Sequence, residues 1–185
     1  MNRLKNDRQI NLMPITNVDN FTEINYGWTF SPFGQCLIYF YKDYIVGLAF
    51  NGSNTRKAAE IDMTSRWKKI QFFRDDKKTS RWGRKIFYEN KDLNLMVWGT
   101  TFQTDVWCAL LNISFGSTVT YSEVSQLIKA PNSVRAVATA IGKNPIAWLI
   151  PCHRVISKTS ALSGYHWGLE LKQKMLHYEG SLMPS

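Results

Sequence analysis

The chain has 185 residues, of which 44% are hydrophobic, and a formal net charge of +9 at pH 7. This length fits one domain or two small ones, and the apolar content is that of a globular protein with a packed core rather than a disordered chain. Its three cysteines are widely spaced and form no CxxC pair, which excludes a disulfide framework and a cysteine-based zinc knuckle. Reduced thiols predict a cytoplasmic location, associated with the nucleoid in a bacterium.

The first 20 residues are polar and are expected to be loosely ordered. They contain no continuous apolar run, so they do not resemble a signal peptide, and no later stretch has the length of a membrane span. The positive net charge is compatible with a polyanionic partner. The densest basic segment, residues 66–85, is interpreted as a solubilising surface, because charge alone does not identify a partner.

Residues 21–98 predict a small β-rich N-terminal domain. Runs of aromatic and β-branched residues at 36–41, 44–50 and 93–98 predict strands. The sequence SPFG at residues 31–34 predicts a hairpin turn. The boundary with the next domain is expected near Gly99.

From residue 99 the pattern becomes helical. Phe102, Val106 and Leu110 recur at i, i+4 and i+8, which predicts a helix with Thr101 as its N-cap. The sequence therefore predicts a mainly helical second domain over residues 99–180, followed by a short tail at 181–185.

Two further short helices predict a helix-turn-helix. The first is expected to begin after Thr120 or Ser122, and the second covers residues 134–141 with Ser133 as its N-cap. Arg135 is a lone arginine on this second, alanine-rich helix. It would face solvent in a structural helix, whereas in a binding helix it would contact phosphate or reach between bases.

The most chemically informative segment is residues 151–156, with the sequence PCHRVI. Cys152 stands beside His153 and Arg154, and nearby positive charge or a base turns a thiol into a strong nucleophile. Pro151 disfavours a helical conformation of the residue before it, so the apolar run 146–150 is expected to end as an extended segment. The alternative is a buried, inert thiol.

Several motifs together resemble the O6-alkylguanine-DNA alkyltransferases, including the C-terminal domain of Ada-type proteins. They are GTTFQ at 99–103, VW at 106–107, YS at 121–122, VRAV at 134–137, NP at 144–145, PCHRVI at 151–156 and LSGY at 162–165. The resemblance covers residues 99–180 strongly and the N-terminal part weakly. It implies an α+β fold, with a small β-rich, ribonuclease H-like N-terminal domain and a helical C-terminal domain that contains a helix-turn-helix.

The resemblance implies direct-reversal DNA repair. A guanine alkylated at O6 is flipped out of duplex DNA, because its reactive atom is inaccessible inside the base stack. Cys152 then takes the alkyl group irreversibly, as a methylated-DNA–protein-cysteine S-methyltransferase that reacts once and inactivates itself. The implied partner is double-stranded DNA, bound through the minor groove by a monomer, with no cofactor, no metal and no membrane.

The family's catalytic roles fall on five residues of this chain. The resemblance implies that Cys152 is the alkyl acceptor and that His153 activates it through an intervening water. The water agrees with an extended chain, in which adjacent side chains point to opposite sides. Glu179 orients the imidazole, and Asn144 shapes the turn around the active segment. Tyr121 assists base extrusion and protonates guanine N3.

The remaining implied site residues contact DNA or the flipped base. Arg135 is expected to fill the vacated position in the base stack. The other DNA-contacting residues are Ser133, Val134, Ala136 and Thr139, and the pocket residues are Tyr165, Ser163, Val155 and Trp107.

The chain departs from the family pattern at three places. Trp148 is bulkier than the usual residue in the apolar run, His166 replaces an arginine of bacterial relatives, and the loop 157–161 has no glycine. Three alternative functions remain: a damage-recognition module without chemistry, a transcription regulator and a cysteine hydrolase. Cys152 itself argues against the first, the shortage of base-reading side chains against the second, and the absence of an evident oxyanion constellation in the sequence against the third.

Overall fold

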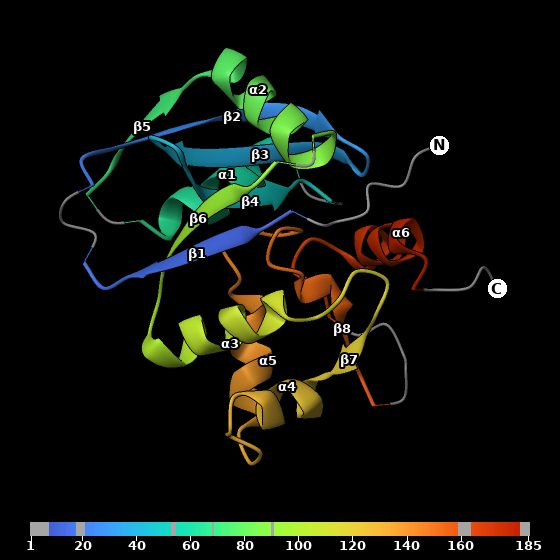
Figure 1. The fold of residues 1–185 in the computed structure, drawn as a ribbon. Coiled ribbons are helices and arrows are strands. Elements are labelled where there is room, and N and C mark those ends of the chain that lie inside the picture. The colour runs from blue at the N-terminus through green and yellow to red at the C-terminus, as the bar shows by residue number, and fades with distance from the viewer. Residues whose placement is uncertain are drawn as a thin grey trace. The chain divides into compact units, whose positions relative to one another are not determined.

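The computed structural model describes residues 8–17, 21–52, 55–67, 69–89, 91–158 and 164–181. The chain divides into two compact units, Met1–Trp98 and Gly99–Ser185. Each unit combines helices with strands, so the fold is α+β as predicted (Figure 1). The limits of the two domains as independent units stay a prediction.

The first unit is built on a six-stranded mixed sheet in the order β1-β6-β4-β3-β2-β5 (Figure 1). Its strands are β1 (Ile10–Ile15), β2 (Glu23–Ser31), β3 (Gly34–Tyr41), β4 (Tyr44–Phe50), β5 (Gln71–Arg74) and β6 (Leu93–Trp98). Strands β2, β3 and β4 are antiparallel neighbours, while β6 adds to β4 in parallel. The almost continuously buried side chains of β3 and β4 form the core of this unit. The three strands predicted at 36–41, 44–50 and 93–98 are confirmed.

Two helices pack on this sheet, α1 (Arg56–Ser65) on β4 and α2 (Asp76–Phe87) on β2 and β3. Helix α2 buries Trp82, Ile86 and Phe87 and exposes Lys77 and Arg81. Much of the basic segment 66–85 is therefore the solvent-facing side of an amphipathic helix. The sequence pattern did not reveal this helix, because its charged residues obscure the apolar spacing.

The N-terminal segment corrects an expectation. Ile10–Ile15 forms strand β1, which pairs in parallel with β6 along its whole length. The prediction that the first 20 residues are loosely ordered is therefore wrong for this stretch. The sequence signal was weak because β1 is a half-buried strand with an exposed Met13, and its hydrogen-bonding partner lies about 80 residues along the chain. Residues 1–7 and 18–20 lie outside the described part of the chain.

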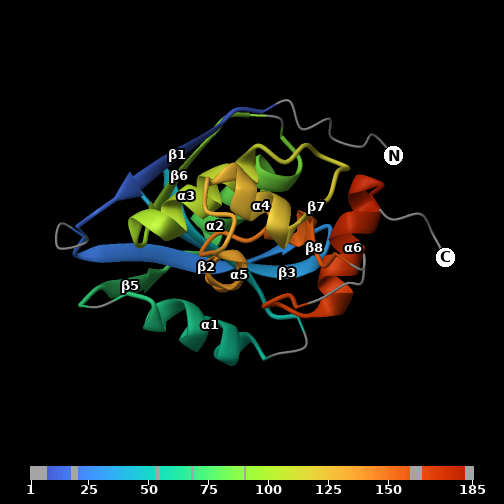
Figure 2. The ribbon, with the colours of Figure 1, turned by 90° about the horizontal axis from the view of Figure 1, so that it is seen from below.

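The described residues of the second unit form four α-helices and a two-stranded sheet. The helices are α3 (Thr101–Leu111), α4 (Tyr121–Leu127), α5 (Val134–Gly142) and α6 (Leu169–Glu179); the short strands are β7 (Val119–Thr120) and β8 (Val155–Ile156). Helices α3, α4 and α5 pack against one another, and α4 and α5 form the predicted helix-turn-helix. A 3₁₀ turn, η1 (Cys152–Arg154), leads into β8 and packs against α6. Figure 2 labels β8 and α6 side by side.

The N-cap residues of these helices differ in part from those predicted. The N-cap of α3 is Thr100 rather than Thr101, because Thr100 and Gln103 form a reciprocal capping box. Thr120 caps α4 in the same way with Glu123. Ser133 occupies the N-cap position of α5, but its side chain makes no capping hydrogen bond. In the described ranges, no helix combines the length and apolar character needed to cross a bilayer.

Candidate active site and DNA-facing helix

Cys152 follows a series of tight turns rather than a strand. The Ile150 N–H donates to Ile146 O over 3.0 Å, and the Cys152 N–H donates to Ile150 O over 2.8 Å. Pro151, with φ −81° and ψ 61°, is thus the centre of an inverse γ-turn. The prediction that residues 146–150 end as an extended segment is wrong, because the backbone of this segment hydrogen-bonds to itself.

The side chain of Asn144 connects these turns to the thiol. Its Oδ1 accepts a hydrogen bond from the Ile146 N–H at 3.0 Å, and its Nδ2 donates to Ile150 O at 2.8 Å. Nδ2 also lies 3.0 Å from Cys152 Sγ. The asparagine is buried, so one amide both supports the turn and supplies a donor to the sulfur.

His153, Arg154 and Glu179 form a buried ionic cluster. His153 Nε2 lies 2.9 Å from Glu179 Oε1, and the Arg154 guanidinium donates to both carboxylate oxygens, from Nη2 to Oε1 at 2.8 Å and from Nε to Oε2 at 2.9 Å. Burial would raise the pKa of Glu179, but the hydrogen bonds from His153 and Arg154 hold it at about 2. Glu179 is therefore an ionised hydrogen-bond acceptor at neutral pH.

The environment keeps the imidazole of His153 neutral. Burial lowers its pKa, Glu179 opposes that effect, and the positive charges of Arg154 and Lys172 add to it. Because Glu179 accepts, Nε2 carries the ring proton and Nδ1 keeps its lone pair. Within the described part of the chain, Nδ1 has no hydrogen-bond partner although it is buried. The ring therefore presents an unused base.

The thiol of Cys152 is buried, and burial raises its pKa. Asn144, Lys172 and Tyr165 oppose this effect by favouring the thiolate. Burial is the main cause that raises the pKa of Tyr165, and the nearby Cys152 raises it further. The phenol therefore keeps its proton and stays a hydrogen-bond donor. The resting cysteine is therefore a thiol whose proton must be removed, with three groups placed to stabilise the thiolate.

Sequence reasoning missed Lys172, and it noted Arg154 only as a positive charge beside Cys152, not as the partner of Glu179. Lys172 has no exposed surface, and its Nζ donates to Val155 O over 2.6 Å. Burial lowers its pKa to about 8, and Cys152 opposes that shift. The sequence did hold a sign that Lys172 is buried. Lys172, Met175 and Glu179 recur at helical spacing, which places them on one face of α6, and that face is buried.

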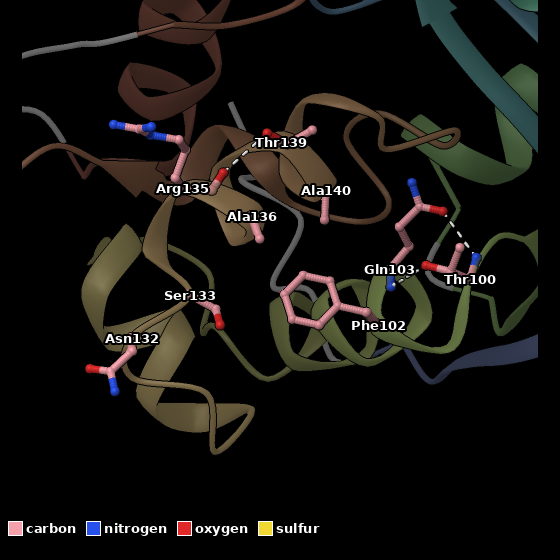
Figure 3. A pocket seen from close by; sticks show the side chains of 9 residues that line it. All are labelled: Thr100, Phe102, Gln103, Asn132, Ser133, Arg135, Ala136, Thr139 and Ala140. Atoms are coloured by element: carbon pink, nitrogen blue, oxygen red, sulfur yellow. Dashed lines mark hydrogen bonds between the residues drawn. The ribbon is translucent and has the colours of Figure 1, made fainter.

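Helix α5 presents a face of small side chains with one cation. Arg135, Ala136 and Thr139 are exposed, while Val137 and Ala140 are buried. This face borders a surface pocket between α5 and the start of α3, where Phe102 and Ser133 also line the wall (Figure 3). Arg135 extends away from Phe102 (Figure 3). The helix thus offers a smooth surface with a projecting guanidinium.

The other predicted site residues lie in varied environments. Tyr121 is the half-buried first residue of α4, and Val134 is half-buried at the start of α5. Trp107 is buried, and its Nε1 donates to Ala140 O over 3.0 Å, so it packs α3 against α5. Val155 is buried beside the cysteine segment, and Ser163 lies outside the described residues. The roles of all these residues stay predictions.

Comparison with known proteins decides the family. Residues 101–181 match the model of the 6-O-methylguanine DNA methyltransferase DNA-binding domain. The inducible methylated-DNA–protein-cysteine methyltransferase of Bacillus subtilis is 38% identical over 144 residues, which cover 72% of this chain and 79% of the relative. The chain belongs to the methylated-DNA–protein-cysteine methyltransferase family.

Other members of this methyltransferase family match shorter parts. A probable methyltransferase of Acanthamoeba polyphaga mimivirus is 47% identical over 97 residues, 52% of this chain and 63% of the relative. The Ada regulatory protein of Salmonella typhimurium is 48% identical over 87 residues, 47% of this chain and 25% of the relative. The matched region thus spans less than two thirds of these two relatives.

Solved structures of methyltransferases share the fold. The crystal structure of the Mycobacterium tuberculosis O6-methylguanine methyltransferase superimposes with a TM-score of 0.67 at 30% identity, over 88% of this chain and 96% of that one. The OGT protein of the same organism in complex with DNA gives a TM-score of 0.67 at 31% identity, over 85% and 93%. The family resemblance drawn from the motifs is confirmed.

Proposed function

We propose that this methyltransferase-family chain is a direct-reversal DNA repair protein that moves the alkyl group of O6-alkylguanine in DNA to Cys152. The observation that carries the proposal is the cysteine environment: a buried thiol that has the amide of Asn144 3.0 Å from its sulfur and precedes a neutral, buried His153. Family membership supplies the substrate class, since relatives are named for methylated DNA.

In the first step, α5 enters the minor groove and the damaged base leaves the stack. The small side chains of Ala136 and Thr139 support a close approach of the helix backbone to the duplex. Arg135 projects from the same face and fills the position of the flipped nucleotide, which offsets the cost of unstacking. Tyr121 crowds the phosphate of that nucleotide.

In the second step, the thiol loses its proton. The Nδ1 atom of His153 accepts it through a water, and the ionised carboxylate of Glu179 stabilises the imidazolium that forms. The donors around the sulfur, Asn144 and Tyr165, hold the thiolate until it reacts. Asn144, His153 and Glu179 are held by buried contacts before substrate arrives, which is what electrostatic preorganisation requires.

In the third step, the S–C bond forms as the C–O6 bond breaks. The electron pair of the broken bond passes to the guanine, which Tyr121 protonates at N3; Tyr121 then regains a proton from solvent, while the imidazolium of His153 releases one to solvent. The products are an S-alkyl cysteine and an intact guanine. A thioether has no easy leaving group, so Cys152 is consumed and each molecule reacts once. Tyr165, Ser163, Val155 and Trp107 are assigned to the base pocket.

We further propose that the protein acts as a monomer in the cytoplasm, without a cofactor or metal. The chemistry requires a free Cys152, and reducing conditions maintain one. The three alternatives receive less support. A recognition-only module has no use for the contacts made to Cys152, a sequence-reading regulator needs more base-reading side chains than α5 exposes, and a hydrolase needs a step that releases the thioether.

The test is incubation with a duplex that contains O6-methylguanine, followed by intact-protein mass spectrometry and peptide mapping. We expect one methylene per molecule, located on Cys152, and no transfer to Cys152→Ala. Cys108→Ser, which removes an exposed thiol, is the matched control and should react normally. Methylation of the Cys152→Ala variant, or lesion binding by the natural protein without transfer, would overturn the proposal.

A further inference from the structure

Trp148 occupies a backbone conformation that normally favours glycine. Its φ is +70°, and the Leu149 N–H donates to Ala147 O over 2.8 Å, which closes a three-residue turn centred on the tryptophan. Turns of this kind with positive φ are rare and strained for a bulky residue. Contacts of the Trp148 side chain must therefore stabilise this strained backbone conformation.

The indole of Trp148 lies on the imidazole of His153. The ring centroids are 5.2 Å apart with an interplanar angle of 14°, so the rings are stacked. Tyr178 of α6 contacts the indole edge-on, at 5.9 Å and 74°. His153 has no exposed surface and Trp148 is half-buried, so the indole is the outer member of the stack.

This stack acts on the charge state of His153. The charged groups that face the imidazole are Glu179 and Lys172 of α6 and Arg154 of η1, and Cys152 is the titratable neighbour on its own turn. Two of these groups are cations that oppose protonation of the ring. An indole face attracts a cation but has no comparable attraction for a neutral ring. Trp148 therefore stabilises His153 selectively after the ring has accepted a proton, which is the form present as the sulfur reacts.

We propose that Trp148 is a positioning residue for alkyl transfer, which holds the imidazole of His153 in its reactive orientation and favours the imidazolium. The kinetic part of this inference rests on the proposed function, whereas the effect on His153 does not.

The test compares Trp148→Leu, which removes the aromatic face, with Trp148→Phe, which keeps a weaker one. Both replacements meet the same unfavourable φ, so backbone strain is matched. We expect single-turnover methyl transfer to be roughly 3- to 10-fold slower for Leu, with Phe intermediate. By NMR titration without DNA, the pKa of His153 should fall by about half a unit in the Leu variant. Trp98→Leu, at an exposed tryptophan of the other unit, is the control and should change neither quantity.

An unchanged pKa of His153 in both Trp148 variants would overturn the proposal, even if they unfold at a lower temperature, since a purely structural role predicts that result. Should the Leu variant fail to fold, the Phe variant decides, because an intermediate shift is expected for it. If the natural protein transfers no methyl group, the proposed function fails, but the titration still decides whether Trp148 acts on His153.

Discussion

The side-chain amide of Asn144 lies 3.0 Å from Cys152 Sγ and 2.8 Å from the carbonyl oxygen of Ile150, so one side chain holds both the sulfur and the turn before it. Asn144→Asp tests this relationship with almost no change in shape. The new carboxylate replaces a donor by an acceptor and places negative charge beside the sulfur, which raises the pKa of Cys152. We expect methyl transfer to slow by at least about tenfold. A rise of one unit in the pKa of Cys152 lowers the fraction of thiolate at neutral pH by a factor of about ten.

Alkylation of the Asn144→Asp variant by iodoacetamide across a pH series measures the same quantity without DNA. Its rate should rise at a higher pH than in the natural protein. Cys108→Ser serves as the background in both proteins, because Cys108 is exposed and would also react. An unchanged pH profile would mean that the amide supports the turn only.

Glu179 makes the stability of the second unit depend on acid. Its folded pKa of about 2 is lower than the ordinary value of 4.5, so the unfolded chain binds the proton more readily. The stabilisation is therefore fully present above about pH 4.5 and is lost as the pH falls toward 2. It amounts to about 3 kcal/mol, which urea unfolding at a series of acidic pH values measures.

Glu179→Gln should lose most of this acid dependence. It should also be less stable at neutral pH by about 3–5 kcal/mol, because Arg154 remains buried without its counter-charge. Glu170→Gln is the matched control, since Glu170 is an exposed carboxylate of the same helix with a surface partner, Lys174. If the stability of the two variants fell equally in acid, Glu179 would not be the source of the acid dependence.

Lys172 should contribute more to reactivity than to stability. Its folded pKa of about 8 lies below the ordinary 10.5, so between these values the unfolded state binds more protons and stability rises with pH. Below pH 8 the buried charge costs about 3 kcal/mol. Lys172→Met removes this cost but leaves Val155 O without its donor, a loss of about 1–3 kcal/mol.

We therefore expect Lys172→Met to stay within about 2 kcal/mol of the natural protein at neutral pH, by urea unfolding. Methyl transfer should slow, because the thiolate loses a nearby cation. A large fall in stability with an unchanged rate would show instead that the hydrogen bond to Val155 is the main contribution of Lys172.

Arg135 should matter for the duplex and not for the chemistry. Arg135→Ala leaves the vacated base position unfilled, and unstacking costs a few kcal/mol, so transfer from duplex DNA should fall at least about tenfold. Transfer from the free base O6-methylguanine should not change. Lys143→Ala, another exposed cation near the end of α5, should have a smaller effect. Equal losses with duplex and free base would contradict the intercalating role.

The parts of the fold that follow from neighbouring residues were predictable. Strands β3, β4 and β6 appear as runs of β-branched and aromatic residues, and Thr120, one of the two caps considered for α4, acts within three residues of sequence. The cap of α3 was placed one residue too late, at Thr101 instead of Thr100. The motifs around Cys152 indicated the family by their residue types alone, and they made Cys152 the candidate nucleophile. The prediction that residues 146–150 end in an extended conformation was nevertheless wrong. The side chain of Asn144 makes the hydrogen bonds to this segment that neighbouring strands would make in a sheet.

The sequence by itself thus determined the family, singled out Cys152 as the candidate nucleophile, and predicted those strands and helices whose residues show a clear local pattern. Only the tertiary structure decided which distant groups meet: β1 with β6, Arg154 with Glu179, Lys172 with Val155, and Trp148 with His153. These contacts depend on which face of each element is buried. Burial, rather than residue type, distinguishes the buried Lys172 of α6 from the exposed Lys174 and makes the histidine beside the cysteine a neutral base.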